Sequence, residues 1–179
     1  MLSAHDGALR NARLKLSYLK AIQRWHWTPK CLHDTGLLPG ALCWRCQYSD
    51  CDIVHLLWEC PKITSYWTAV WKTMQKVLGT CKSLTNKAAI LHSNKGYPEH
   101  HEYRWFDTAM ATANMGILRF WRTDTKPKYR TWFEDMHTVA AHERVTYKVN
   151  DQMEIFANHS GVFLHLPDIY TTADPQTTD

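Results

Sequence analysis

The sequence predicts a mainly α-helical protein with a small inserted zinc-knuckle module. Apolar residues recur every three or four positions over several long segments, which is the spacing of a helix that buries one face. Proline and glycine separate these segments, and one short stretch concentrates cysteine and histidine. With 179 residues, 45% of them hydrophobic and nine of them tryptophan, the chain can bury a sizeable core, which excludes wholesale disorder.

The first predicted element is a basic amphipathic helix over residues 6–27, within a first unit of residues 1–30. Its expected apolar face consists of Leu9, Ala12, Leu16, Leu19 and Ile22. We expect the helix to end at Thr28-Pro29, because the residue before a proline avoids the helical region. Residues 30–42, which contain two glycines and a proline, should form a loop.

The next unit, residues 31–82, is expected to hold the knuckle and a following helix. Residues 54–78 show a helical pattern that Pro61 interrupts, and a new helix should begin there because proline suits the first helical turn. The expected buried face of that helix holds Ile63, Trp67, Val70, Trp71, Met74 and Leu78.

A helical C-terminal unit is expected over residues 83–166. It should contain a short helix at 86–92 and a longer one at 102–122. The longer helix has a wide apolar face and should therefore be the most buried: Phe106, Ala109, Met110, Ala113, Ile117, Phe120 and Trp121.

A further helix should begin near Thr131, with apolar positions that include Trp132, Met136, Val139 and Ala140. A turn or change of phase should then lead to Val149, Met153 and Phe156, with an end at Ser160-Gly161. Residues 162–166 should be extended or irregular, and residues 167–179 should form a disordered tail.

Four cysteines and one histidine lie within the stretch CWRCQYSDCDIVHLLWEC, Cys43 to Cys60. Cys43 and Cys46 have the C-x2-C spacing with which a tight turn directs two thiolates at one ion. His55 and Cys60 supply a second pair, and Cys51 is a rival ligand that would release one of them. Five candidate donors favour one zinc ion over buried free thiols, and four soft ligands favour a closed structural site over a catalytic one.

The knuckle segment, CWRC followed by HLLWECP, resembles the zinc knuckle near the C-terminus of reverse transcriptases from LINE-type non-LTR retrotransposons. Two further blocks are similar to that family: KAIQRWHWTPKCLH at residues 20–33 and MATANMGILRFWRTDTKPKYRTWFEDM at residues 110–136. The similarity covers roughly residues 9–160, in three ordered blocks. It implies one structural zinc ion with a CCHC ligand set: Cys43, Cys46, His55 and Cys60.

The chain departs from the family pattern in two respects. Cys51 is an additional thiol inside the knuckle, and the polymerase is missing, since neither a Y/F-A-D-D motif nor an endonuclease sequence is present. The resemblance therefore implies a non-catalytic C-terminal segment that binds RNA or DNA and supports a reverse transcriptase core.

Cations beside aromatic rings suit phosphate contact and base stacking, and a formal charge of +4 permits such a partner. The candidates come from the first helix, the knuckle and the stretch RFWRTDTKPKYR: Arg13, Lys20, Arg24, Arg45, Arg119, Arg122, Lys126, Lys128 and Arg130. The alternative is that these cations only solvate helix faces and a turn. The chain would then be a zinc-stabilised protein-interaction module that docks tryptophan-rich faces on a polymerase core or a host partner.

No catalytic site is predicted. His137, His142 and Glu143 lack the H-E-x-x-H spacing, and no G-x-S-x-G or Walker glycine loop occurs, so we expect neither enzyme activity nor a small-molecule substrate. No apolar run approaches the roughly 20 residues of a membrane span, and no secretory signal is recognisable. We therefore expect no membrane partner and a nuclear or cytoplasmic location, where cysteines serve as thiols or metal ligands.

Overall fold

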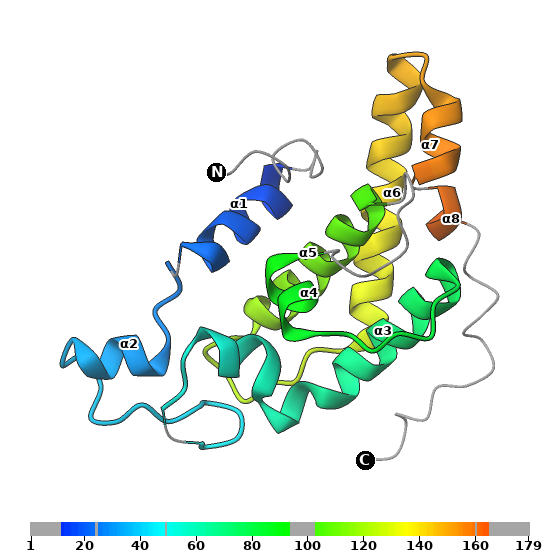
Figure 1. Cartoon of the computed structure of the whole chain (residues 1–179). Coiled ribbons are helices and arrows are strands. Elements are labelled where there is room, and N and C mark those ends of the chain that lie inside the picture. The colour runs from blue at the N-terminus through cyan, green and yellow to red at the C-terminus, as the bar shows by residue number, and fades with distance from the viewer. Residues whose placement is uncertain (1–11, 24, 49, 94–102, 160, 165–179) are drawn as a thin grey trace.

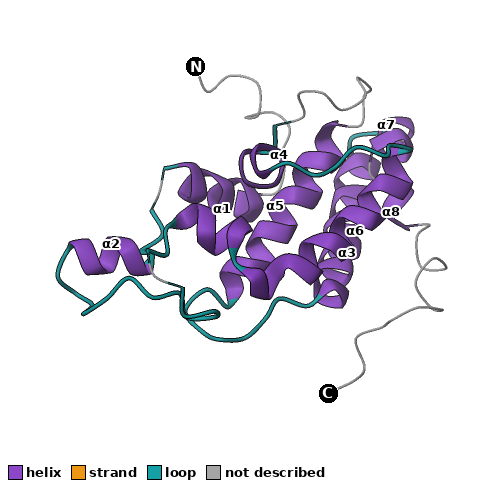
Figure 2. Ribbon diagram, turned by 60° about the horizontal axis from the view of Figure 1, so that its bottom comes forward, coloured by secondary structure: helices purple, strands orange, loops and turns teal. Residues whose placement is uncertain are grey.

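Helices make up all regular secondary structure in the part of the chain that the computed structural model describes, namely residues 12–23, 25–48, 50–93, 103–159 and 161–164. Figure 2 shows them joined by loops, so the prediction of a mainly α fold is confirmed. None of the helices in these ranges combines the length and the apolar character that crossing a membrane requires.

Helix α5, Tyr103–Arg119, is the centre of the structure. It packs against α1 (Ala12–Ile22), α4 (Asn86–Leu91) and α6 (Tyr129–Val149), which surround it in Figure 1. Every residue from 105 to 114 is buried, whichever side of the helix it occupies. The predictions of a short helix near residue 86 and of a most-buried helix after it are confirmed. Helix α5 ends at Arg119, however, so Phe120 and Trp121, which were expected on its buried face, lie in the turn that follows and are half-buried.

The helical segment over residues 54–78 is interrupted at Cys60 and begins again at Pro61, as predicted. It consists of a π-helical turn η1 (His55–Glu59), a 3-10 turn η2 (Pro61–Ile63) and helix α3 (Thr64–Leu78). The buried residues of this segment include five of the predicted face: Ile63, Trp67, Val70, Trp71 and Met74. Leu78 packs against the same core while partly exposed.

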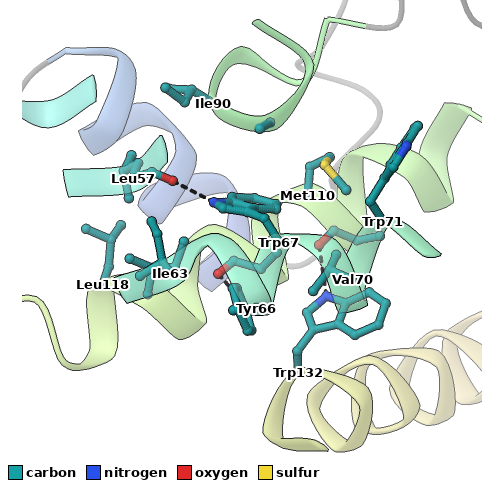
Figure 3. Packing of buried hydrophobic residues seen from close by; sticks show 14 of the residues in the cluster. Leu57, Ile63, Tyr66, Trp67, Val70, Trp71, Ile90, Met110, Leu118 and Trp132 are labelled. Atoms are coloured by element: carbon teal, nitrogen blue, oxygen red, sulfur yellow. Dashed lines mark hydrogen bonds between the residues drawn. The ribbon is translucent and has the colours of Figure 1, made fainter. Parts of the chain in front are cut away.

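Buried polar atoms of aromatic side chains tie the helices together, as Figure 3 shows. The indole N–H of Trp67 donates to the carbonyl of Leu57 at 2.8 Å, which joins α3 to η1. The indole N–H of Trp132 donates from α6 to the carbonyl of Ala109 on α5 at 3.1 Å. Each large ring is therefore buried without leaving its donor unsatisfied.

The N-terminal helix ends earlier than predicted, while its predicted start at residues 6–11, with Leu9, lies outside the described residues. Helix α1 ends at Ile22, and a second helix, α2 (Pro29–Asp34), lies where a loop was expected. The Thr28 hydroxyl accepts a hydrogen bond from the N–H of Cys31 at 3.3 Å, and Pro29 occupies the first helical turn. The Thr-Pro pair thus begins a helix as an N-cap and N1 residue instead of ending one.

The buried face of α1 also differs from its prediction. Leu14 and Ala21 are buried and Tyr18 is half-buried, whereas Leu16, expected in the core, is exposed. Leu14 packs against Ala111 of α5 within a small second cluster of buried residues. The helix therefore presents the stripe 14, 18 and 21 to its neighbours and leaves Leu16 on its open side.

The C-terminal helices are more regular than expected. Helix α6 runs unbroken to Val149, and the turn before α7 (Met153–His159) is made by Asp151 in the left-handed region, with φ of +55°. Helix α8, Gly161–Leu164, replaces the extended piece that was predicted from residue 162. The predicted tail, 167–179, lies outside the described residues.

One hydrophobic cluster includes Ala21, the cysteines Cys43, Cys51 and Cys60, and residues of α3 to α6 as far as Ala140. The predicted division at residues 30, 82 and 166 is not tested by this packing and stays a prediction.

We expect substitution of Gly116 to reveal how closely α3 approaches α5. A Cβ added at Gly116 would lie 2.8 Å from the hydroxyl oxygen of Tyr66, which donates to the Ala113 carbonyl at 3.0 Å. Gly116→Ala should therefore lower the free energy of unfolding by about 1–3 kcal/mol in urea titrations.

Tyr66→Phe supplies the control, because it removes the oxygen that the new methyl group would strike. In that background Gly116→Ala should become neutral or stabilising, since alanine is favoured over glycine in a helix by about 0.5–1 kcal/mol. Equal costs in both backgrounds would contradict the described contact.

Candidate metal centre and adjoining basic groove

Four side chains between α2 and η2 converge on one point. The ligand atoms of Cys43, Cys46, His55 and Cys60 all lie within 4.8 Å of one another. The sulfurs of Cys43 and Cys60 are 3.9 Å apart, and Nε2 of His55 is 3.2 Å from the sulfur of Cys46. A tetrahedral zinc site with Zn–S bonds of about 2.3 Å has sulfurs about 3.8 Å apart, so the cluster has the size of one bound ion.

The first two donors lie on a tight turn. The N–H of Gln47 donates to the carbonyl of Cys43 at 2.9 Å, and Gln47 is left-handed with φ of +59°. Hydrogen bonds from the Cys51 and Cys60 thiols, and to a smaller extent from the backbone N–H groups of Cys46 and Arg45, lower the pKa of Cys43. The C-x2-C spacing thus gives a turn that directs two thiols inward and supports one as a thiolate.

The second two donors depend on the π-helical turn. The N–H of Cys60 donates to the carbonyl of His55 at 2.9 Å, a bond between residues five apart that brings both side chains to one side. Asp52 begins this turn by accepting the N–H of His55 at 2.9 Å, and Tyr48 stacks on the imidazole with centroids 4.8 Å apart. The donor spacing is evident from the sequence, which contains no signal for a π turn.

The thiols are crowded enough to perturb one another. Hydrogen bonds from Cys51 and then Cys60 lower the pKa of Cys43, and the same bonds, with burial, raise the pKa of Cys51 and of Cys60. One thiolate therefore suppresses ionisation of its neighbours, and a bound cation would relieve that repulsion. Cys51 is buried beside Cys43 but does not belong to the group of four donors.

Arg45 joins this metal centre to the helices. It is only 6% exposed, and its two terminal nitrogens donate to the carbonyls of Leu56 and Ile117, each at 3.0 Å. Ile117 lies in the last turn of α5, and its carbonyl also accepts the N–H of Phe120 at 3.3 Å. The expectation that Arg45 reaches a phosphate does not fit this position, because its guanidinium is buried and engaged.

A groove between α1 and α5 gathers three of the predicted cations. Its volume is about 330 Å³, and it is lined by Arg13, Leu16, Ser17, Lys20, His26, Met115, Leu118 and Arg119, so that part of its wall is apolar. The residues that line it include no Asp or Glu, although Arg119 also donates to Asp135 at 2.9 Å. The groove is therefore a positively charged recess.

His26 was not predicted as a site residue. Its buried Nε2 finds no hydrogen-bond partner within the described part of the chain, and burial followed by the charge of Lys20 lowers its pKa. The ring is therefore neutral near pH 7 and can accept or donate one bond to a ligand in the groove. Its position between two tryptophans after a basic helix was the available sequence signal.

Trp121 connects the groove to the metal centre. Its ring meets His26 edge-on at 5.7 Å and Trp44 of the knuckle turn at 5.7 Å. The guanidinium of Arg122, another predicted cation, lies over the same ring at 4.6 Å. The ring of Trp121 thus contacts both Trp44 of the knuckle turn and His26 of the groove.

The other predicted cations lie elsewhere. Lys126 and Lys128 are exposed before α6, and Arg130 pairs with Glu134 one turn along the helix at 3.1 Å. Tyr129, between them, shares a 2.9 Å hydrogen bond with Thr73, which places this segment beside α3. None of the three lines the groove, and Arg24 lies outside the described residues.

No protein-family model matches this chain. Its chemistry must be understood from the two sites themselves. At the metal centre, three sulfurs and one imidazole nitrogen form a complete tetrahedral set, and Cys43, His55 and Cys60 are buried. Such a closed set stabilises a fold, since catalytic sites keep a position open for water or substrate.

We expect one divalent ion per chain and a selective loss on removing a donor. Titration with Co²⁺, followed by its thiolate absorption bands, should reach one equivalent in the parent chain. Cys60→Ser should weaken binding by at least about 100-fold, because one of four donors is lost. Cys51→Ser is the matched control and should bind normally; the opposite order would identify Cys51 as the ligand.

We expect Arg45→Met to lower the free energy of unfolding by about 3 kcal/mol with metal present. The substitution keeps an unbranched side chain but leaves two buried carbonyls without their charged donor. Arg144→Met, at an exposed position on α6, should change stability by less than about 0.5 kcal/mol. Similar urea midpoints for the two variants would refute a structural role for Arg45.

Proposed function

We propose that this protein is a zinc-stabilised nucleic-acid-binding module without catalytic activity of its own. The observation that carries the proposal is the α1–α5 groove, which collects Arg13, Lys20 and Arg119 from segments about a hundred residues apart in sequence. Lys and Arg that neutralise phosphates supply most of the non-specific affinity of such proteins.

Zinc is the ion that best suits the metal centre. Three cysteines and one histidine are a common structural zinc set, and zinc tolerates mixed sulfur and nitrogen ligands without redox chemistry. In this proposal the ion holds residues 43–60 in place, and Trp44 transmits that order to Trp121 and to the groove.

The resemblance of the knuckle and its flanking blocks to the C-terminal segment of non-LTR reverse transcriptases supports the same function. A segment of that kind would bind template RNA or target DNA beside a reverse transcriptase core. The proposal therefore includes such a core as a partner, with the chemistry residing in the partner and nucleic-acid contact residing here.

A docking module for a protein is the second candidate. Large apolar side chains are exposed on and around the knuckle, among them Leu37, Leu42 and Tyr48. Exposed apolar residues that lie together favour a protein interface. Such binding would depend little on salt, whereas phosphate contacts release counterions and weaken steeply as salt rises.

We expect the parent chain to bind RNA or DNA with an affinity that falls as salt rises from about 50 to about 200 mM. Lys20→Gln should weaken binding and reduce the slope of log K against log salt by about 0.7–0.9, the contribution of one phosphate contact. Fluorescence anisotropy measures both quantities.

Lys72→Gln is the matched control, because Lys72 is exposed on α3 and does not line the groove. It should bind as the parent does. Equal losses from both variants would indicate a general charge effect, and absence of binding at low salt would favour the docking module.

A further inference from the structure

Two exposed tryptophans flank His26, a residue that lines the groove. Trp25 is 63% exposed and Trp27 is 47% exposed, whereas the other seven tryptophans are buried or half-buried. Both lie on the connection between α1 and α2, which runs along the outer edge of the molecule in Figure 1. Their large rings contribute little to the core, so a role in packing does not explain them.

Backbone hydrogen bonds order the segment that carries these two rings. The N–H of Trp25 donates to the Lys20 carbonyl at 2.9 Å, and the N–H of Thr28 donates to the His26 carbonyl at 2.9 Å. His26, between the tryptophans, lines the groove and contacts Trp121. Trp25 and Trp27 adjoin this histidine in sequence and are exposed to solvent.

We infer that Trp25 and Trp27 form a stacking platform for the bases of a single-stranded nucleic acid whose phosphates occupy the groove. This inference rests on the proposed nucleic-acid function and adds the form of the ligand. Residues two apart can place their Cα atoms up to about 7 Å apart, about twice the 3.4 Å rise between bases along one strand. Lys20 lies five residues before Trp25, so a cation and an aromatic ring occur close together in the sequence.

The surroundings favour an unpaired strand over other occupants. Duplex bases are already stacked on one another, so exposed rings reach only bases that are splayed out. Cores of protein interfaces are enriched in tryptophan but depleted in lysine, whereas Lys20, whose carbonyl accepts the N–H of Trp25, lines the groove. Alternating cations and aromatic rings are the usual equipment of single-strand sites.

The test compares the metal-loaded full chain with its Trp25→Ala/Trp27→Ala variant. Labelled single strands of about 12 nucleotides, as RNA and as DNA, and the matching duplex serve as probes in anisotropy titrations. The variant should bind single strands at least about tenfold more weakly, since one stacked base contributes about that factor or more, and should bind the duplex unchanged.

Two controls accompany the test. Leu37→Ala removes another strongly exposed apolar side chain, 65% exposed, and should leave single-strand affinity unchanged. Trp25→Phe/Trp27→Phe keeps stacking rings and should retain most of it. Quenching of tryptophan emission by the single strand should disappear from the alanine variant as well.

The possible outcomes distinguish a failure of the stacking platform from a failure of the proposed nucleic-acid function. Unchanged single-strand affinity in the alanine variant, with Lys20→Gln still defective, would overturn the platform and leave the nucleic-acid function intact. An equal loss for duplex and single strand would also overturn it. No binding of any probe by the parent at low salt would overturn the platform together with the proposed function.

Discussion

The convergence of four donor atoms on one point is the constraint on which the rest of the structure depends. The described residues between Thr35 and Val54 form no long helix, so the backbone path of this segment is set by the turn at Cys43 and by the π turn that follows. On this path Trp44 contacts the ring of Trp121, and Arg45 donates to the Ile117 carbonyl. The Leu57 carbonyl accepts the indole N–H of Trp67. An ion between the donors would secure all of these contacts at once.

The groove depends on this constraint indirectly. Its walls are α1 and α5, but its end is formed by His26, which rests on Trp121. Trp121 in turn rests on Trp44, which lies between the first two metal donors in sequence. Two sites with different chemistry are therefore built on one aromatic contact chain, and the order of one sets the shape of the other.

Periodicity was sufficient to predict the helices with a single, well-defined apolar face. It located α3, α4 and α5 and most of the buried face of α3, because a face that packs on the core must repeat every three or four positions. In α5 it identified only part of the buried surface, since residues 105–114 are buried on every side of that helix. It failed for α1, where leucines occupy more than one side and the contact with Ala111 decides which side is buried. It also failed at Thr28-Pro29, since that pair is equally suited to follow one helix and to cap the next.

For the candidate site, spacing identified the donors because metal geometry restricts how far apart ligands can lie in sequence. Spacing could not reveal that Arg45 is buried, since only the fold brings the Ile117 carbonyl to it. Nor could it reveal the groove, which joins Arg13 to Arg119 across the whole chain. The choice of candidate nucleic-acid contacts by charge alone therefore included Arg45, which instead donates hydrogen bonds to the carbonyls of Leu56 and Ile117.

The burial of Arg45 has a consequence for the charge balance of the molecule. Three thiolates, a neutral imidazole and a divalent ion sum to a formal charge of −1, and the adjoining guanidinium brings the sum to zero. With an ion bound, the low-dielectric interior would thus enclose a neutral unit, although each of its members would be costly to bury alone. Without the ion, Cys43 would remain the thiolate whose charge offsets that of Arg45, while the hydrogen bond to Cys43, together with burial, keeps the Cys51 and Cys60 thiols protonated.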